Sequence, residues 1–199
     1  AQLPAQCRVE GDWSNAAFFL CAGALGGETE ITGLSLDSRQ SDRALTDILK
    51  AFGADIKCGS SVSVCKSELS GITVDISQCP DLFPTLAVTA CAAHGDTVFT
   101  NAARLRIKES DRIEAVEKMI TSLGGFAEST PDSLTVHGTG TLAGGEVNSF
   151  NDHRIVMAAA VAACICESPV VIRDAQAVNK SYPDFFEDYK KLGGKADVI

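Results

Sequence analysis

The chain has 199 residues, of which 45% are hydrophobic, and its formal net charge at pH 7 is -9. This length can fill one good core, or at most two small ones. The acidic balance argues against a nucleic-acid partner, which normally needs a broad basic face. The longest unbroken apolar run, from Ile155 to Cys166, is too short to cross a bilayer, so we expect no membrane partner and a cytoplasmic location.

Eight cysteines could indicate disulfides or a zinc site, but their spacing favours neither. No Cys-x-x-Cys pair occurs, and the three histidines make no metal-binding spacing with the cysteines. A thiol in an alanine-rich helix packs as a small hydrophobic group. We therefore expect reduced, buried thiols in a reducing compartment and no metal site. Seven of the eight cysteines are divided between helical stretches, with Cys21, Cys91, Cys164 and Cys166, and short strands or turns, with Cys58, Cys65 and Cys79.

The predicted elements begin with a strand over 7–10 and a helix over 14–25, which Gly26-Gly27 ends. An alternating strand over 29–34 follows, and then a helix over 41–52 that stops at Gly53. Two short strands are predicted over 55–58 and 61–65. This order of strand, helix, strand, helix, strand and strand forms the first of three similar units.

The second unit begins with a strand over 71–76 and a helix over 81–93, and continues with a strand over 97–101. A basic stretch over 104–112 leads into a helix that ends before Gly124, and strands over 126–129 and 134–137 close the unit. The third unit contains a helix over 153–166, a strand over 170–173 and a helix over 182–192. Its closing strand is absent.

The repeat is regular, because the glycines that stop the second helix of each unit, Gly53, Gly124 and Gly193, lie 71 and 69 positions apart. One such unit cannot cover both faces of its own sheet. Within the predicted helices over 81–93 and 153–166, the stretches 88–93 and 155–166 are apolar on every side, as in helices that are enclosed by the rest of the protein. We therefore predict an α/β domain over 1–199 in which three βαβαββ units surround central helices and carry their sheets outside.

The stretch from Arg104 to Arg112 is the strongest candidate for a functional site. Its basic residues are Arg104, Arg106, Lys108 and Arg112, and they reverse the local sign of charge in an acidic chain. Leu105 and Ile107 alternate with them as on a strand, and Ser110 and Asp111 can cap the following helix. A helix N-terminus flanked by cations suits a phosphate or carboxylate group.

Glu109 is the acidic member of this stretch, and two interpretations stay open for it. Among cations and a bound anion, its carboxylate could shuttle a proton. It could equally form a solvated ion pair with Arg112 or Lys108.

Further polar residues stand at the other predicted helix starts, which three units around one axis would bring to the same end of the domain. They are Asp12, Ser14, Asp81, the run from Asn151 to Arg154, and the run from Lys180 to Asp184, in which Ser181 and Asp184 have capping-box spacing. Each acidic or hydroxyl residue alone is explained as an ordinary helix cap worth about 1 kcal/mol.

Capping does not explain the cations at these positions. Lys108, Arg112, Arg154 and Lys180 oppose the helix macrodipole, at a cost of roughly 0.3 to 1 kcal/mol each, unless something negative binds between them. We therefore predict a bound phosphate or carboxylate, with cations exposed to solvent as the alternative.

Five motifs in matching order resemble the 5-enolpyruvylshikimate-3-phosphate synthase family, and the resemblance spans essentially the whole chain. The motifs are Val9-Glu-Gly-Asp-Trp-Ser-Asn-Ala-Ala17, Pro80-Asp81, Arg106-Ile-Lys-Glu-Ser-Asp-Arg112, Asn151-Asp-His-Arg154 and Lys180-Ser-Tyr-Pro-Asp184. The family fold is an inside-out α/β domain of three repeated units, one of two such domains. The resemblance implies transfer of the enolpyruvyl group of phosphoenolpyruvate to the 5-hydroxyl of shikimate 3-phosphate, through a tetrahedral ketal, with release of phosphate.

The resemblance also implies a role for each matching residue. Asp81 would take the proton of the attacking hydroxyl, and Glu109 would protonate and later deprotonate the methylene carbon of phosphoenolpyruvate. Asp81 and Lys108 would contact shikimate 3-phosphate, with Lys108 also stabilising charge beside the reacting groups, and His153 would support the site by hydrogen bonding. The residues that would bind phosphoenolpyruvate are Arg112, Arg154 and Lys180. Neither a metal nor an organic cofactor is implied.

Family members carry a second domain of the same architecture, which supplies most contacts to shikimate 3-phosphate. The resemblance therefore implies that this chain is the C-terminal half of the enzyme, lacks its N-terminal domain as a partner, and is inactive alone. A short N-terminal segment normally completes this domain's sheet, so an unpaired edge is expected.

Three rival interpretations remain. The related enolpyruvyltransferase acting on UDP-N-acetylglucosamine shares the architecture, although the motifs at 151–154 and 180–184 favour the shikimate enzyme. In a non-catalytic anion-binding module, Asp81 and Glu109 would be caps only. A purely structural repeat protein would have no affinity for phosphate.

Overall fold

The computed structural model describes residues 9–199. The predicted strand over 7–10 begins outside these residues, and its described part, Val9 and Glu10, is not in a strand. The elements of the first unit are α1 (Trp13–Gly26), β1 (Glu28–Thr32), the 3-10 helix η1 (Ser41–Ala44), α2 (Leu45–Phe52), β2 (Asp55–Cys58) and β3 (Ser61–Cys65).

The second and third units follow the predicted order closely. The second contains β4 (Thr73–Asp75), η2 (Pro80–Leu82), α3 (Phe83–Cys91), β5 (Gly95–Thr100), η3 (Ala103–Ile107), α4 (Arg112–Ser122), β6 (Phe126–Thr130) and β7 (Ser133–Gly138). The third contains β8 (Gly145–Asn148), α5 (His153–Ala162), η4 (Ala163–Ile165), β9 (Val170–Arg173), η5 (Ala175–Lys180) and α6 (Phe185–Lys191).

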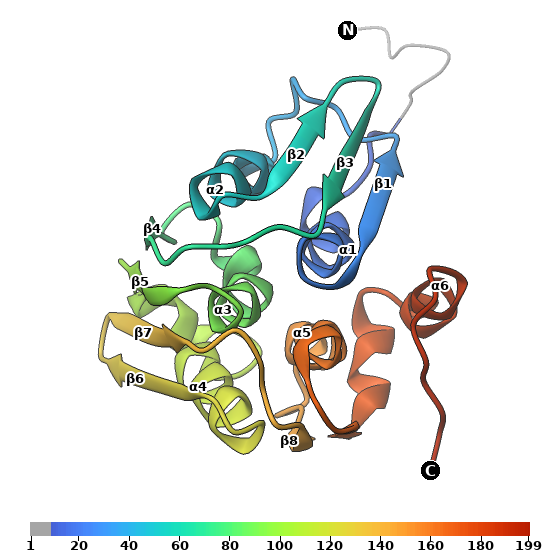
Figure 1. Ribbon diagram of the computed structural model, residues 1–199. Coiled ribbons are helices and arrows are strands. Elements are labelled where there is room, and N and C mark those ends of the chain that lie inside the picture. Colours follow the sequence, from blue (N-terminus) through green and yellow to red (C-terminus); the bar gives the residue numbers. More distant parts are fainter. Residues whose placement is uncertain (1–8) are drawn as a thin grey trace, which may run out of the picture.

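Each unit contributes one sheet to the outside of the molecule. The strand orders are β1-β3-β2, β4-β5-β7-β6 and β8-β9, in which β4 and β5, and β8 and β9, run parallel and the other pairs antiparallel. Figure 1 shows these sheets around α1, α3 and α5, which contact one another at the centre. Every residue of α3 and α5 is buried, because both helices are apolar all round and lie inside the three sheets. The predicted inside-out arrangement is confirmed.

The backbone repeats as the sequence does. Gly53, Gly124 and Gly193 have φ values of 98°, 84° and 97°, a left-handed conformation that only glycine adopts without a steric cost. The residues after β1, β5 and β9, which are Gly33, Asn101 and Asp174, are also left-handed. The spacing of the helix-stop glycines therefore reports a turn that recurs in all three units.

Some predicted elements differ from the structure. β8 was not predicted, because it begins at the second of two adjacent glycines and its four residues carry little alternation. The helix expected over 153–166 ends at Ala162 and continues as the 3-10 helix η4. That turn brings Cys164 to the surface, and Cys58 is exposed on β2, so the expectation of buried thiols is wrong for these two residues.

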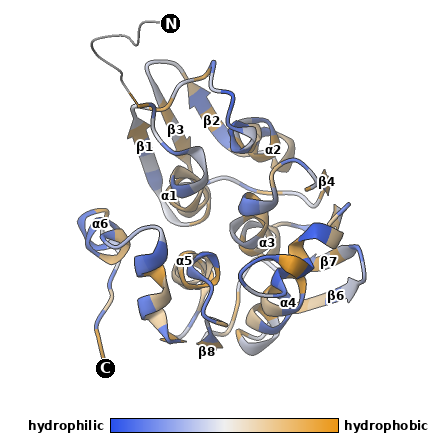
Figure 2. Cartoon of the chain, turned by 180° about the vertical axis from the view of Figure 1, so that it is seen from behind, coloured by the Kyte–Doolittle hydropathy of each residue, from blue (hydrophilic) through white to orange (hydrophobic). Residues whose placement is uncertain are grey.

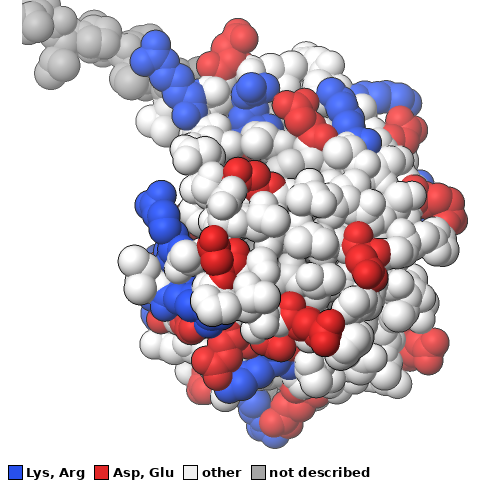
Figure 3. Space-filling view, turned by 90° about the vertical axis from the view of Figure 1, so that its left-hand side faces the viewer, with Lys and Arg blue, Asp and Glu red and all other residues white. Residues whose placement is uncertain are grey.

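Charged residues cover the outside unevenly. On the face shown in Figure 3, acidic side chains are spread among uncharged ones, and basic side chains lie mainly toward its edges. Over residues 9–199, no helix combines the length and the apolar character that a membrane span would need.

Candidate functional site

The guanidinium of Arg112 is the centre of a buried charge cluster. Its Nη1 donates to Asp81 Oδ1 at 2.6 Å, its Nη2 to Glu109 Oε2 at 2.6 Å, and its Nε to Asp152 Oδ2 at 2.9 Å. Arg112 is the first residue of α4, Asp81 belongs to η2, and Asp152 caps α5. The side chain of Arg112 is 1% exposed and that of Asp152 is fully buried. One side chain thus joins the N-terminal ends of helices from the second and third units.

Asp81 extends the cluster to two more cations. Its Oδ2 lies 3.2 Å from Arg154 Nη2, and its Oδ1 lies 3.5 Å from Lys108 Nζ. Arg154 Nη2 also donates to Ser14 Oγ at 3.1 Å, which brings in α1 from the first unit. Five of the predicted site residues, Asp81, Lys108, Glu109, Arg112 and Arg154, therefore form one connected network of ion pairs.

Local structure fixes the basic stretch in a conformation that differs from the predicted one. Residues 103–107 form the 3-10 helix η3, and the expectation that Leu105 and Ile107 alternate on a strand is wrong. β5, the strand that precedes this stretch, is already paired on both sides, with β4 and β7. Leu105 is buried and Ile107 is 84% exposed. Figure 2 shows the segment between β5 and α4 as a mainly hydrophilic loop beside α4.

The side chain of Arg106 holds this loop in place. It donates to the backbone oxygens of Thr130 and Pro131 at 2.6 and 2.9 Å, and to Asp111 Oδ2 at 2.8 Å. Asp111 in turn accepts from the backbone N–H of Glu114 as the N-cap of α4. Because the loop is anchored at the β6–β7 turn and at the helix start, Lys108 and Glu109 are presented from a fixed backbone.

The charges within the cluster already balance. Asp81, Glu109 and Asp152 face Lys108, Arg112 and Arg154, so three carboxylates meet three cations. The argument that misplaced cations imply a bound anion therefore does not hold for these three residues, because the chain supplies the negative charge. An incoming anion must therefore compete with the carboxylates that already contact the guanidinium groups.

The pKa values of the acidic members follow from this pairing. Burial alone would raise the pKa of Asp81, but the nearby Arg154 and Arg112 outweigh it and hold that pKa below its ordinary value. Burial likewise opposes the charge on Asp152, and its hydrogen bond to Arg112 outweighs burial, so its pKa is also lowered. Both carboxylates are ionised at neutral pH and can accept a proton or a hydrogen bond.

Two buried nitrogen atoms in the cluster have no hydrogen-bond partner among residues 9–199. They are His153 Nδ1 and Arg154 Nε, and both residues are more than nine-tenths buried. Burial, and then the positive charge of Arg154, lower the pKa of His153, so its ring is neutral near pH 7. Unpaired buried polar atoms are costly unless a ligand or water meets them, so this side of the cluster suits a polar ligand.

Lys180 and His153 are predicted site residues that lie outside the ion-pair network, and of the two only Lys180 is exposed. Lys180 lies at the end of η5, where its Nζ donates to the backbone oxygen of Asn151. The predicted capping box of Ser181 and Asp184 is wrong, because α6 starts only at Phe185 and the side chain of Asp184 makes no cap bond. Because Asn151 directly precedes Asp152 in the chain, this hydrogen bond places Lys180 at the border of the cluster.

Three residues of the site were not assigned a role from the sequence. Asp152 lies within the motif at 151–154, and from the sequence it looks like an ordinary helix cap. It does cap α5, and it also pairs with Arg112, which the sequence did not indicate. Ser14 was interpreted only as a cap, and it contacts Arg154. Asp42 stands in η1, and its pKa is raised to about 6 by burial and by the nearby Asp81. Only the motifs themselves could have pointed to Asp152 and Ser14, and no sequence signal marked Asp42.

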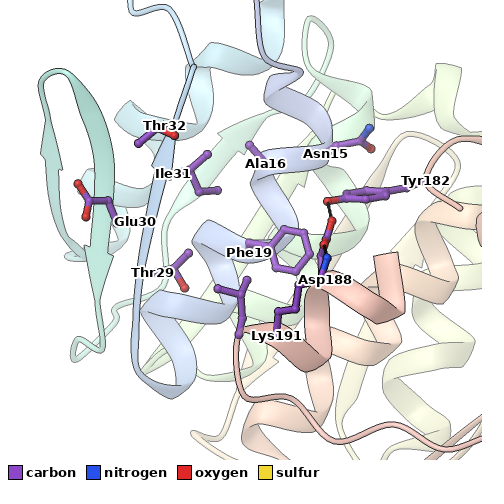
Figure 4. Close-up of a pocket in the computed structure, with 11 residues that line it drawn as sticks. Asn15, Ala16, Phe19, Thr29, Glu30, Ile31, Thr32, Tyr182, Asp188 and Lys191 are labelled. Carbon is purple, nitrogen blue, oxygen red and sulfur yellow. Dashed lines mark hydrogen bonds and ion pairs between the residues drawn. The ribbon is translucent and has the colours of Figure 1, made fainter. Parts of the chain in front are cut away.

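A cavity of about 390 Å³ lies apart from this cluster, between α1, β1 and α6 (Figure 4). None of the predicted site residues lines it, so the ion pairs, and not this cavity, define the candidate site. In the described part of the chain, no three His, Cys, Asp or Glu side chains are grouped so that they could hold a metal ion. The cavity is lined by residues that include Asn15, Phe19, Ile31, Tyr182, Asp188 and Lys191.

Comparison with known proteins gives a consistent result. The family model of EPSP synthase (3-phosphoshikimate 1-carboxyvinyltransferase) matches residues 1–189. The 3-phosphoshikimate 1-carboxyvinyltransferase of Clostridium novyi is 48% identical over 96% of the chain, and that of Clostridioides difficile is 44% identical over 96%. A solved EPSP synthase from Acinetobacter baumannii superposes on 94% of the chain with a TM-score of 0.85 and 30% identity. The chain spans about half the length of these proteins, 44% of both curated relatives and 47% of the solved chain.

Proposed function

The chain belongs to the EPSP synthase family, and from this membership we propose that it forms half of an enzyme that transfers the enolpyruvyl group of phosphoenolpyruvate to shikimate 3-phosphate. The bond formed joins the 5-hydroxyl oxygen to C2 of phosphoenolpyruvate, and the bond later broken releases phosphate from the ketal. The observation that carries the proposal is the Arg112 cluster, in which two carboxylates suited to proton transfer share one guanidinium.

In the addition step, Asp81 takes the proton of the attacking hydroxyl while Glu109 gives a proton to the methylene carbon. In the elimination step, Glu109 removes a proton from the resulting methyl group as phosphate departs. Glu109 is the most exposed of the cluster's three carboxylates, with a side chain 43% exposed, and a single hydrogen bond joins it to Arg112. This supports its role as the mobile proton carrier.

In this proposal phosphoenolpyruvate binds by displacing protein carboxylates from the guanidinium groups. Its carboxylate and phosphate take the places on Arg112 and Arg154 that Glu109 and Asp81 occupy in the absence of substrate. Lys180 reaches the same anion from the border of the cluster. Asp81 and Lys108 face shikimate 3-phosphate, and neutral His153 supplies a hydrogen bond through its unpartnered Nδ1.

We further propose that the chain is the C-terminal half of the enzyme and needs its N-terminal partner domain for turnover. Its relatives are about twice as long, which supports this division. The purified 199-residue chain should release no phosphate from the two substrates, and addition of the missing half should start turnover. Turnover by the chain alone would refute the division but not the reaction.

The decisive experiment uses the enzyme with both halves and measures phosphate release from phosphoenolpyruvate and shikimate 3-phosphate. Glu109→Gln and Asp81→Asn should each lower turnover by about a hundredfold or more, because each removes a proton-transfer group. Binding of phosphoenolpyruvate should survive. Glu114→Gln, an exposed change in the first turn of α4, is the matched control. Unchanged turnover in both variants would contradict the catalytic roles of Asp81 and Glu109. Anion binding without any phosphate release by the unmutated enzyme with both halves would favour a non-catalytic anion-binding module.

The cytoplasmic location is also a proposal. It is supported by eight cysteines without disulfide-like or zinc-like spacing, which are typical of a reducing compartment. Fractionation of cells that express the full enzyme would test it, and recovery outside the cytoplasmic fraction would contradict it.

A further inference from the structure

We propose that Ser14 is a positioning residue that fixes the orientation of Arg154 for anion binding, an inference that rests on the proposed function. Ser14 Oγ donates to Asp12 Oδ1 at 2.8 Å and accepts from Arg154 Nη2 at 3.1 Å. Ser14 is 6% exposed and Arg154 is 7% exposed. The contact joins the first helix of the chain to a residue 140 positions away.

The direction of these hydrogen bonds follows from the chemistry of the three groups. A guanidinium can only donate and an ionised carboxylate can only accept, so the Ser14 hydroxyl must donate to Asp12 and accept from Arg154. Asp12 is itself held as the N-cap of α1, where Oδ1 accepts from the backbone N–H of Ser14 at 2.8 Å and Oδ2 accepts from Asn15 Nδ2 at 3.0 Å. Because Asp12 is fixed at the N-terminus of α1, the Ser14 hydroxyl that bonds to both groups holds Arg154 at a fixed position relative to α1.

Arg154 needs this contact because its other partner is shared. Its second short side-chain contact is with Asp81, at 3.2 Å from the same Nη2, and Asp81 is also held by Arg112 and Lys108. In the proposed reaction Asp81 turns to the attacking hydroxyl and weakens its hold on Arg154. Arg154 Nη1 lies only at 3.5 Å from the backbone oxygen of Asp81, so Ser14, at 3.1 Å, is then the shorter contact that keeps the guanidinium in place. The unpartnered Nε stays available to an anion.

The test is Ser14→Ala in the enzyme with both halves. We expect the KM for phosphoenolpyruvate and the Kd for inorganic phosphate to rise about tenfold, because a hydrogen bond to a charged group is lost. The value of kcat should stay within about twofold, since neither proton-transfer group is touched. Asn15→Ala is the matched control, because it removes a neighbouring side-chain bond to the same Asp12 carboxylate without a contact to Arg154. The control should leave KM and Kd unchanged.

A double variant separates positioning from a general effect on the fold. In an Arg154→Lys background the guanidinium is gone, so Ser14→Ala should change KM by less than about twofold. A full tenfold effect in that background would overturn the inference, as would equal rises for Ser14→Ala and Asn15→Ala, or no rise for Ser14→Ala. An inactive wild-type enzyme would instead refute the proposed function, and the phosphate Kd would still test the role of Ser14.

Discussion

Two groups of charges in this molecule have similar chemistry and different surroundings. At the N-terminal ends of the helices, Arg112 contacts three carboxylates with a side chain 1% exposed. On the outer sheet, His137 contacts Asp96 at 2.8 Å and Glu128 at 3.4 Å, and these two carboxylates are 58% and 66% exposed. Water screens the outer group and competes for its hydrogen bonds, whereas the inner group depends on its own members for compensation.

The difference shows how the fold prepares its site. Burying ions costs free energy, which good geometry and complete hydrogen bonding can offset. The guanidinium of Arg112 meets this condition, because all three of its nitrogen atoms donate to carboxylates. The cluster draws residues from three units, and the central helices hold them at one end of the molecule. A preorganised cluster of this kind can exchange its own carboxylates for an incoming anion without rebuilding its surroundings.

The largest effect that we expect in this comparison is on stability. Asp152→Ala leaves the buried Nε of Arg112 without its partner, leaves three cations facing two carboxylates, and removes the cap of α5. It should therefore lower the free energy of unfolding by about 3 to 5 kcal/mol. Asp96→Ala on the outer sheet should lower it by less than about 1 kcal/mol. Denaturant unfolding of both variants gives the two values. Similar losses would show that burial does not distinguish the two groups.

At Asp42 we expect an effect of intermediate size, on the pH dependence of the free energy of unfolding. Asp42 is a partly buried carboxyl whose Oδ1 has no hydrogen-bond partner among residues 9–199. Burial, followed by the charge of Asp81, raises its pKa to about 6. The folded protein therefore binds this proton more tightly than the unfolded chain, whose pKa is about 3.9. The contribution to stability is complete below about pH 4 and is lost as the pH rises through about 6.

Asp42→Asn has no proton to lose at this position, so its stability should fall less than that of the wild type between pH 4 and pH 7. The full shift corresponds to about 3 kcal/mol, and solvent screening of this partly exposed group reduces the expected gain at pH 7 to about 1 kcal/mol. Unfolding at several pH values measures the difference. Asp47→Asn, on the exposed side of α2, is the control. Parallel pH profiles for wild type and Asp42→Asn would contradict the prediction.

Periodicity predicted the repeat, the enclosed helices and the outer sheets, because each of these follows from local patterns of apolar residues and glycines. Local patterns failed where a tertiary contact decides the conformation. The stretch around Leu105 alternates like a strand, yet Arg106 ties it to the β6–β7 turn as a 3-10 helix. Asp152 resembles an ordinary cap until Arg112, 40 positions away, is brought beside it. The cluster was predictable as a meeting of motifs, but its internal charge balance was not.

The smallest effect on stability is expected at Lys180, where the cluster meets the surface. Lys180 Nζ donates to the Asn151 oxygen at an exposed position, so Lys180→Met should change the free energy of unfolding by less than about 0.5 kcal/mol. The same change at Lys190, exposed on α6, is the control for stability and should leave substrate affinity unchanged. In the proposed site Lys180 contacts phosphoenolpyruvate. Lys180→Met in the enzyme with both halves should therefore raise the KM for phosphoenolpyruvate several-fold, because an ammonium that pairs with the bound anion is lost. A loss of stability comparable to that of Asp152→Ala would assign Lys180 to the buried cluster, and an unchanged KM would remove it from the substrate site.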